Sequence, residues 1–354
     1  MFEVRGTITY QRLREIGTGE GKNSIVHLAY DPVLRRDIAV KEIAKSKFGN
    51  DFDSYCHEAR VMFATADPNI VDLEFVCETC DSIILALPYY ANGSLQKRIS
   101  THPLPFRELL KLTQVLVAAL SRIHVSGFLH LDLKPANVLF DDLGRPLLSD
   151  FGQSRRLSAT GTVTYPDIYK WCMPPETLVS HVATVESDIY QLGALLYRAA
   201  NGNSIYEAQK AQLASGADLQ KQIERGTFPD RDFFLPHVPK RVRSILRKAM
   251  RVNPAERYRS AVDFGAAFGR VPLDVDWQTQ CLGNGGYVWR AARPGRPNLE
   301  VALLQDAANT WKVEAWTVRP QERRKKNVKE DWRSGLRYQE AMKHLTEVFA
   351  RLGQ

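Results

Sequence analysis

The sequence predicts an α+β protein that can bury a substantial core and that contains more than one structural unit. Three observations lead to this prediction. A strand-like pattern over residues 38–43 is followed by a helical stretch over residues 52–66. The chain has 354 residues, which at ~150 residues per domain allows two or three domains. Its composition shifts near residue 270, where five of the six tryptophans and a second group of strand-like segments begin.

Composition and charge narrow the class of protein further. Hydrophobic residues make up 44% of the chain, which excludes a wholly disordered protein. Five cysteines are too few for a disulfide framework in a chain of this length. No apolar run reaches the ~18 residues of a membrane span, and the N-terminus lacks an apolar signal core. We therefore expect a soluble, cytoplasmic protein without a membrane partner, whose net charge of +8 favours anionic ligands.

The first informative segment, residues 16–26, contains three glycines at alternate positions, Gly17, Gly19 and Gly21. A turn of this kind lets the backbone approach phosphate groups without obstruction by side chains, although an ordinary glycine-rich hairpin has the same pattern. The strand over residues 38–43 that follows carries Lys41 inside a β-branched run. The helical stretch carries Glu58 near its middle, and a buried pair between these two side chains would hold the lysine ready for phosphate oxygens.

The central segment of the chain concentrates polar groups that phosphoryl transfer requires. Asp132, Lys134 and Asn137 lie within six residues, in a loop that Pro135 keeps from becoming a regular helix. Asp150 follows a short predicted strand pair. One carboxylate can orient an attacking hydroxyl, hard oxygen ligands can hold Mg²⁺, and a lysine can neutralise charge on the transferred group. Polar turn residues would explain each of these side chains singly, but not their joint spacing.

With these segments in place, the chain resembles the eukaryotic-type (Hanks-type) serine/threonine protein kinase family. The resemblance rests on motifs that occur in the family's order from about residue 9 to residue 268: Gly19-x-Gly21-x-x-Ser24-x-Val26, Ala39-Val40-Lys41, Glu58, Asp67-Pro68-Asn69-Ile70-Val71, His130-Leu131-Asp132, Asp150-Phe151-Gly152, Pro174-Pro175-Glu176, Asp188-Ile189-Tyr190-x-Leu192-Gly193 and Asn253-Pro254-x-x-Arg257. Lys134, two residues after Asp132, follows the serine/threonine pattern. About ten motifs in one order are far more specific than a single match.

The resemblance implies a bilobal kinase fold over residues 9–268. It would have an N-lobe of about residues 9–87, a hinge of about 88–92 and a C-lobe of about 93–268. It further implies ATP as co-substrate, Mg²⁺ or Mn²⁺ as the metal, and protein partners that carry serine or threonine. Autophosphorylation is also expected.

The roles implied by the resemblance fall into three groups. The catalytic residues would be Asp132, which orients the substrate hydroxyl, and Lys134, which neutralises the transferring phosphoryl group. The metal ligands would be Asn137 and Asp150. The residues that contact ATP would be Gly17, Gly19, Gly21, Ser24, Val26, Ala39, Lys41, Glu58, Pro88 and Tyr90.

The chain departs from the family pattern immediately before the presumed catalytic aspartate, where Leu131 replaces the usual arginine. That arginine helps to receive a phosphate on the activation segment, so its absence predicts activity without this modification. Several hydroxyl residues in the segment could still be modified: Ser154, Ser158, Thr160, Thr162 and Thr164. A polar, mobile loop explains them equally well.

Residues 271–354 predict a small β-β-β-α module with strands at about 287–293, 299–305 and 311–318 and a helix at about 334–352. Residues 271–354 hold 14 Lys/Arg against 10 Asp/Glu, and residues 319–329 form a basic stretch. A basic loop beside tryptophans could bind nucleic acid, but a solvated linker beside a tryptophan-rich core is the favoured interpretation. A regulatory or substrate-docking partner remains equally open.

Three functional hypotheses follow. The first is an active serine/threonine kinase, favoured because Lys41, Glu58, Asp132, Asn137 and Asp150 are all present. The second is a pseudokinase or scaffold that binds nucleotide without transfer. The third is a nucleic-acid-binding regulator that acts through the C-terminal module. The first two hypotheses differ in whether phosphate is transferred. The third differs in placing the binding affinity, for nucleic acid, in the C-terminal module.

Overall fold

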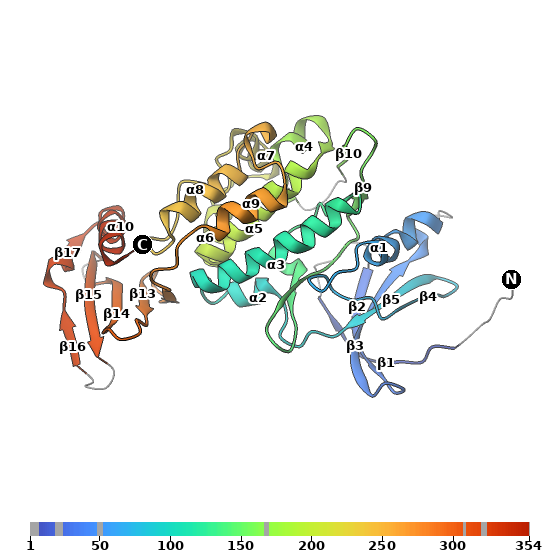
Figure 1. Cartoon of the computed structure of the whole chain (residues 1–354), viewed down its shortest axis with the longest axis horizontal. Coiled ribbons are helices and arrows are strands. Elements are labelled where there is room, and N and C mark those ends of the chain that lie inside the picture. The colour runs from blue at the N-terminus through green and yellow to red at the C-terminus, as the bar shows by residue number, and fades with distance from the viewer. Residues whose placement is uncertain are drawn as a thin grey trace.

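The computed structural model describes residues 7–17, 24–47, 52–165, 170–306, 309–319 and 324–353. Figure 1 shows an elongated molecule in which a sheet-rich N-terminal lobe, a helical lobe and a second sheet follow one another along the long axis. The α+β class and the arrangement as a sheet-rich lobe followed by a helical lobe agree with the prediction. No helix within the described ranges combines the length and the apolar character that crossing a bilayer requires.

The N-terminal lobe is one antiparallel sheet with the strand order β1-β2-β3-β5-β4. Its strands are β1 (Gln11–Ile16), β2 (Ser24–Asp31), β3 (Arg36–Ala44), β4 (Phe75–Glu78) and β5 (Ser82–Pro88). The helix α1 (Phe52–Ala64) packs against it through Ala59, Val61 and Met62. In register, Val26 on β2 lies opposite Lys41 on β3, which lies opposite Leu85 on β5. This register places Lys41 in the middle of the sheet.

The helical lobe is built around α5 (Val185–Asn201), of which every residue from Ser187 to Asn201 is buried. The surrounding helices are α2 (Leu95–Ile99), α3 (Phe106–Val125), α4 (Pro175–Ser180), α6 (Asn203–Ala211), α7 (Gly216–Arg225), α8 (Lys240–Ala249) and α9 (Ala261–Gly269). Three two-stranded sheets, β6 (Phe128–Leu129) with β9 (Arg155–Arg156), β7 (Val138–Phe140) with β8 (Pro146–Leu148) and β10 (Val163–Thr164) with β11 (Val182–Ala183), lie on this lobe. Burying α5 on all sides gives the loops that cross it a rigid support.

The C-terminal module is a six-stranded antiparallel sheet with one long helix, α10 (Tyr338–Gly353). The three strands expected from the sequence are present as β13 (Tyr287–Ala291), β14 (Asn298–Gln305) and β15 (Trp311–Arg319). Three further strands were not predicted: β12 (Gln278–Cys281), β16 (Arg324–Asn327) and β17 (Arg333–Leu336). All three are short and mostly polar, so they lack the alternating apolar pattern that marks a half-buried strand.

Two details of the predicted module are wrong. The helix begins at Tyr338 and not at residue 334, because Gly335 has a φ of +71° that an α-helix cannot accommodate, and Leu336 pairs with Trp311 across the sheet. The basic stretch is not entirely a loop, since Arg324–Asn327 pairs with β15. The expectation of a tryptophan-rich core holds for Trp277 and Trp289, which are fully buried beside Phe349 on α10.

The module is packed against the helical lobe through a buried polar contact. His237, in the loop before α8, accepts a hydrogen bond on Nδ1 from Trp289 Nε1 at 3.1 Å, and its Nε2 lies 3.4 Å from Thr279 Oγ1. Asp276 accepts a bond from the backbone N–H of Arg107 at 3.0 Å, in the first turn of α3. Because Pro105 provides no side-chain cap for α3, Asp276 supplies the missing acceptor from the start of the module.

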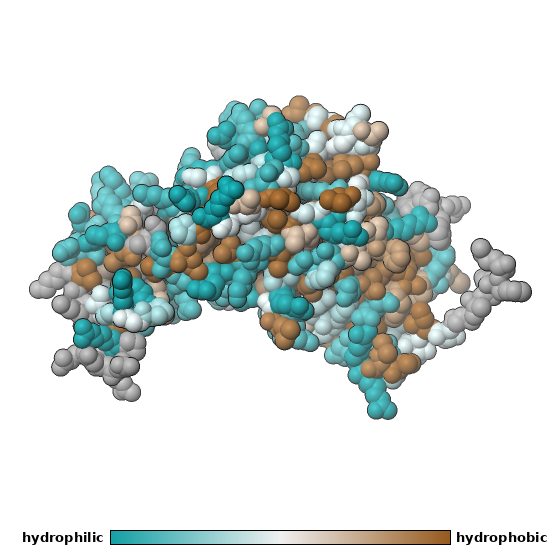
Figure 2. Space-filling model, in the orientation of Figure 1, coloured by the Kyte–Doolittle hydropathy of each residue, from teal (hydrophilic) through white to brown (hydrophobic). Residues whose placement is uncertain are grey.

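Figure 2 shows a largely hydrophilic surface over α8 and α10, whereas hydrophobic residues gather over parts of the N-terminal lobe. Val33 and Leu34, in the turn between β2 and β3, are 81% and 58% exposed. Exposed apolar side chains of this kind are normal on a protein surface and do not by themselves indicate a binding partner.

Candidate active site

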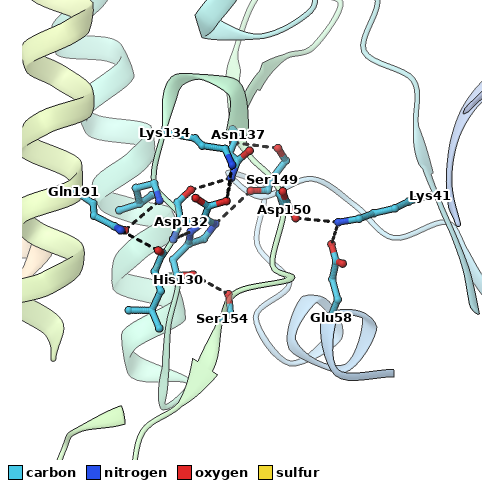
Figure 3. A network of polar contacts seen from close by, with 12 residues as sticks. Lys41, Glu58, His130, Asp132, Lys134, Asn137, Ser149, Asp150, Ser154 and Gln191 are labelled. Carbon is cyan, nitrogen blue, oxygen red and sulfur yellow. Dashed lines mark hydrogen bonds and ion pairs between the residues drawn. The ribbon is translucent and has the colours of Figure 1, made fainter. Parts of the chain in front are cut away.

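The best-defined polar contact between the two lobes joins β3, α1 and the segment after β8. Lys41 Nζ lies 2.7 Å from Glu58 Oε1 and 2.9 Å from Asp150 Oδ1 (Figure 3). The Lys41 side chain is 12% exposed and that of Glu58 is 7% exposed. The lysine therefore sits in a low-dielectric position, held by two carboxylates from elements far apart in the sequence.

The protonation states of this trio follow from burial and charge. Burial alone would lower the pKa of Lys41, but the carboxylates of Asp150 and Glu58 outweigh it and raise that pKa. Burial would raise the pKa of Asp150, but the lysine charge dominates and lowers it to about 2. For Glu58 burial prevails over the charge of Lys41 and raises the pKa. Lys41 is thus a fixed cation and Asp150 a fixed anion.

The loop after β6 holds a second carboxylate between two donors. Asp132 Oδ2 accepts bonds from Lys134 Nζ at 2.8 Å and from Asn137 Nδ2 at 2.9 Å. Asn137 Nδ2 also donates to the backbone carbonyl of Asp132 at 2.8 Å. Pro135 starts a single 3-10 turn, η2 (Pro135–Asn137), so the loop stays irregular as predicted and brings all three side chains together.

This carboxylate is nearly buried, with Asp132 6% exposed. Burial raises its pKa, and the neighbouring Lys134 charge opposes that effect. Beside it, His130 is fully buried and burial lowers its pKa. The His130 Nδ1 atom accepts from the Asp132 N–H at 3.3 Å, and Nε2 faces the Ser149 carbonyl at 3.3 Å. These partners favour a neutral imidazole with its proton on Nε2.

The central helix α5 fixes the backbone of the loop. Asp188 accepts bonds from the N–H groups of His130 at 2.9 Å and Leu131 at 2.8 Å. Gln191, one helical turn later, accepts from Leu133 N–H at 3.1 Å and donates to the Leu131 carbonyl at 2.9 Å. Leu131 has a φ of +65°, an uncommon conformation for a branched residue. These four bonds hold the strained loop in place.

The residues expected to contact the nucleotide lie on the facing strands of the N-terminal lobe. Ser24 begins β2, Val26 lies two residues further, and Ala39 on β3 pairs with Leu87 on β5. Pro88 ends β5 opposite Ile38, so its missing N–H is tolerated at the end of the strand. Of the other expected nucleotide contacts, Gly17 has a φ of +69° and Tyr90 has a pKa raised to about 12 by burial. Gly19 and Gly21 lie outside the described residues.

Leu131 takes part in an apolar cluster where the usual family pattern has an arginine. The members of this cluster are buried residues from β6, the loop after it, the region of the β10–β11 pair and the segment before α4: Leu129, Leu131, Val163, Tyr165, Met173 and Ala183. Leu131 is 1% exposed. Hydrophobic contact therefore joins the loop to the segment that follows Asp150-Phe151-Gly152.

Several residues of the site could not be singled out from the sequence. Gln191 fell at an unspecified position of its motif, although its spacing of three residues from Asp188 places both side chains on one helix face. Ser154 was expected to be open to modification, but it is fully buried and its hydroxyl is not accessible. Its carbonyl accepts from His57 Nε2 at 2.6 Å and so ties the segment after Gly152 to α1. Ser149 donates to the Asn137 carbonyl from both its N–H and its hydroxyl, at 2.9 and 3.0 Å. No local signal marks Ser149 or indicates the contact of Ser154 with His57.

Comparison with known proteins agrees with this geometry. The sequence model of the protein kinase domain matches residues 10–263. The serine/threonine-protein kinase PrkC of Bacillus subtilis is 31% identical over 274 residues, which cover 75% of this chain and 41% of that protein. The serine/threonine-protein kinase PknK of Mycobacterium tuberculosis is 32% identical over 264 residues, covering 72% of this chain and 23% of that protein.

A further relative extends the match slightly. The DNA damage-responsive serine/threonine-protein kinase RqkA of Deinococcus radiodurans is 26% identical over 305 residues, or 83% of this chain and 44% of that protein. The chain thus spans less than half the length of each of these three relatives.

Proposed function

The chain belongs to the protein kinase family, and on that premise we propose that it transfers the γ-phosphoryl group of ATP to serine and threonine hydroxyls of protein substrates. The observation that carries this proposal is the paired set of carboxylates. Asp132 is held by Lys134 and Asn137, and Asp150 is held by Lys41. Asp132 would orient the attacking hydroxyl, and Asp150 would hold the metal ion that neutralises charge on the phosphates of ATP.

Asp132 would orient the substrate hydroxyl and receive its proton. Its carboxylate is fixed by two donors on Oδ2, so it can accept a third hydrogen bond without a change of rotamer. Burial raises its pKa and makes it a better proton acceptor than an exposed aspartate. Lys134, 2.8 Å away, would stabilise negative charge on the transferred group.

Asn137 and Asp150 fit the requirements of Mg²⁺ or Mn²⁺, which prefer hard oxygen ligands. Asn137 uses its amide N–H groups toward Asp132, which leaves its amide oxygen as the free end. Asp150 is ionised, with a pKa of about 2. When bound, the metal would neutralise charge on the phosphates of ATP.

Lys41 would bind the phosphates of ATP, with Glu58 fixing its direction. Val26 and Ala39, which share one face of the sheet, would cover the adenine ring, with the carbonyl of Pro88 and the N–H of Tyr90 as hydrogen-bonding groups. Because Lys41 is positively charged and already bound to two carboxylates, an ATP phosphate would compete with Asp150 for it.

We expect this activity without a phosphate on the activation segment. The apolar cluster that Leu131 shares with Val163, Tyr165 and Met173 would support the segment where an arginine–phosphate contact would otherwise do so. Ser158, Thr160 and Thr162, whose hydroxyls lie within 3.1 Å of one another, are the candidates for autophosphorylation. Phosphatase-treated protein should keep most of its initial rate. A loss of more than about tenfold would overturn this expectation.

The function itself is tested with labelled ATP and Mg²⁺, using the protein alone and a generic basic protein as acceptors. Acid-stable label on serine or threonine is expected in the wild type and should be absent in the Lys41→Ala variant. ATP binding without any transfer would instead favour the scaffold alternative.

A further inference from the structure

A groove separates the C-terminal module from the helical lobe on the side of β12. It has a volume of about 420 Å³. One wall is formed by four consecutive residues of the strand, Gln278 to Cys281, and the other by the connection between α2 and α3, including Thr101 and His102. Because both faces of β12 contribute, the groove runs along the edge of the strand.

β12 is an edge strand of its sheet, since the strand order is β12-β13-β14-β15-β16 and, among the described strands, only β13 pairs with it. The direction of its peptide groups follows from the turn. Leu282 donates to the Gly286 carbonyl at 2.9 Å, so this opposed pair is a hydrogen-bonded one. In an antiparallel pair the hydrogen-bonded positions alternate. Gln280 and Gln278 therefore bond to β13, and the peptide groups of Thr279 and Cys281 point away from it.

These outward groups line the groove. Thr279 directs its hydroxyl to His237 on the inner face of the sheet, so the part of Thr279 that reaches the groove is its backbone. Within the described residues, no backbone bond is made to the outer edge of β12 by any other segment. The edge also lacks the proline, lysine or bulge that usually prevents strand pairing. A row of unpaired N–H and C=O groups in a groove is complementary to an extended polypeptide.

Helix α2 links the groove to the loop that carries Asp132. α2 is a five-residue helix, about 7.5 Å long, that contacts η2 and leads to Thr101 in the groove. The Gly93 carbonyl just before α2 accepts from the Phe140 N–H at 3.1 Å, beside the same loop. A segment bound in the groove would keep a phosphoacceptor on the same polypeptide near Asp132 and raise its effective concentration.

We propose that this groove binds an extended segment of the protein substrate by adding it as a strand to β12, at a distance from the phosphorylated residue. This docking role rests on the proposed kinase function. Main-chain bonds at Thr279 and Cys281 supply the affinity. The walls carry the uncharged polar side chains of Gln278, Gln280 and Thr101 together with the charged Glu108 and Arg290, and therefore favour a polar segment.

The binding step is tested with a phage-displayed library of random heptapeptides, selected on the full chain in the presence of a saturating ATP analogue. Selected peptides should bind with micromolar affinity and slow amide exchange at Thr279 and Cys281 at least tenfold. Cys281→Pro removes an outward N–H while the bonds to β13 stay, and Gln278→Trp fills the groove from an exposed position. Each should weaken binding at least tenfold in a folded protein.

Gln220→Trp, at an exposed position of α7, is the matched control and should bind like the wild type. Failure to select any peptide would overturn the proposal. So would peptides whose affinity is the same for the wild type, Cys281→Pro and Gln278→Trp.

The docking role is tested by joining a selected peptide to a serine-containing acceptor through a ten-residue Gly/Ser linker, whose mean span is roughly 17 Å. The KM should fall at least tenfold with kcat unchanged, and the gain should vanish in Gln278→Trp. An unchanged KM despite peptide binding would overturn the substrate role and leave a regulator as the occupant. No transfer even to the unlinked acceptor would instead count against the kinase function, while the binding result would stand separately.

Discussion

Arg257 and Glu176 form a paired contact across 81 residues of sequence, with Nη1 2.9 Å from Oε1 and Nη2 2.6 Å from Oε2. The arginine side chain is fully buried, and it also donates to the carbonyls of Glu186 and Val252. Glu176 accepts a further bond from the Ser187 hydroxyl. The pair thereby joins the start of α4, the start of α5 and the loop after α8.

Removing the buried cation should therefore destabilise the helical lobe strongly. Arg257→Ala leaves Glu176 without its counter-charge, and breaking such a pair costs about 3–5 kcal/mol. Arg259→Ala is the matched control, because Arg259 is 68% exposed and makes one 3.3 Å contact with Glu186; a change below about 1 kcal/mol is expected. Urea unfolding measures both. Equal losses of unfolding free energy in the two variants would show that the buried pair contributes no more to stability than the exposed contact.

Asp276 should stabilise the junction between the module and α3. Its carboxylate accepts the N–H of Arg107 in the first helical turn, a position where a missing cap costs about 1 kcal/mol. Asp276→Ala should lower the unfolding free energy by this amount. Asp274→Ala, two residues away at an exposed position, should have little effect. Thermal melting of the two variants distinguishes them, and identical melting temperatures would refute the capping role.

His237 should make the protein sensitive to acid. Burial and the charge of Arg243 lower its pKa to about 3, whereas in the unfolded chain it is about 6.5. As the pH falls below about 6.5, the unfolded chain takes up the proton first, so this histidine removes about 1.4 kcal/mol of stability per pH unit down to about pH 3. Above pH 6.5 it contributes no pH dependence.

The comparison with His237→Gln isolates this effect. The variant should lose stability less steeply than the wild type between pH 6.5 and pH 4, as measured by denaturant unfolding at each pH. Parallel curves would mean that the imidazole is already protonated in the folded protein, in conflict with its acceptance of the Trp289 N–H.

The sequence predicts the candidate site well where its groups lie close together in the chain. Asp132, Lys134 and Asn137 occupy one loop, so their spacing alone indicated a shared role, and the structure brings them within hydrogen-bonding distance. Lys41 and Glu58 could be paired because a strand and a helix present one charge each. Which roles these residues perform stays a prediction until transfer is measured.

Other parts could not be predicted because their signal is non-local or weak. His237 is 52 residues from Trp289, and Asp276 is 169 residues from the helix turn that it caps. Neither contact leaves a periodic pattern in the sequence. Apart from Leu336, β16 and β17 consist of basic, polar and glycine residues, and both strands pair with β15. Tertiary context and not propensity therefore decides their conformation.

The most direct measurement compares phosphate transfer and nucleotide binding in the wild type, Asp132→Asn and Asp142→Asn. Asp142 is exposed and lies outside the site, so its variant should behave like the wild type. If Asp132 accepts the hydroxyl proton, Asp132→Asn should transfer phosphate about 10²–10⁴-fold more slowly while binding MgATP with nearly unchanged affinity. Transfer by Asp132→Asn at the wild-type rate would contradict the role assigned to this carboxylate.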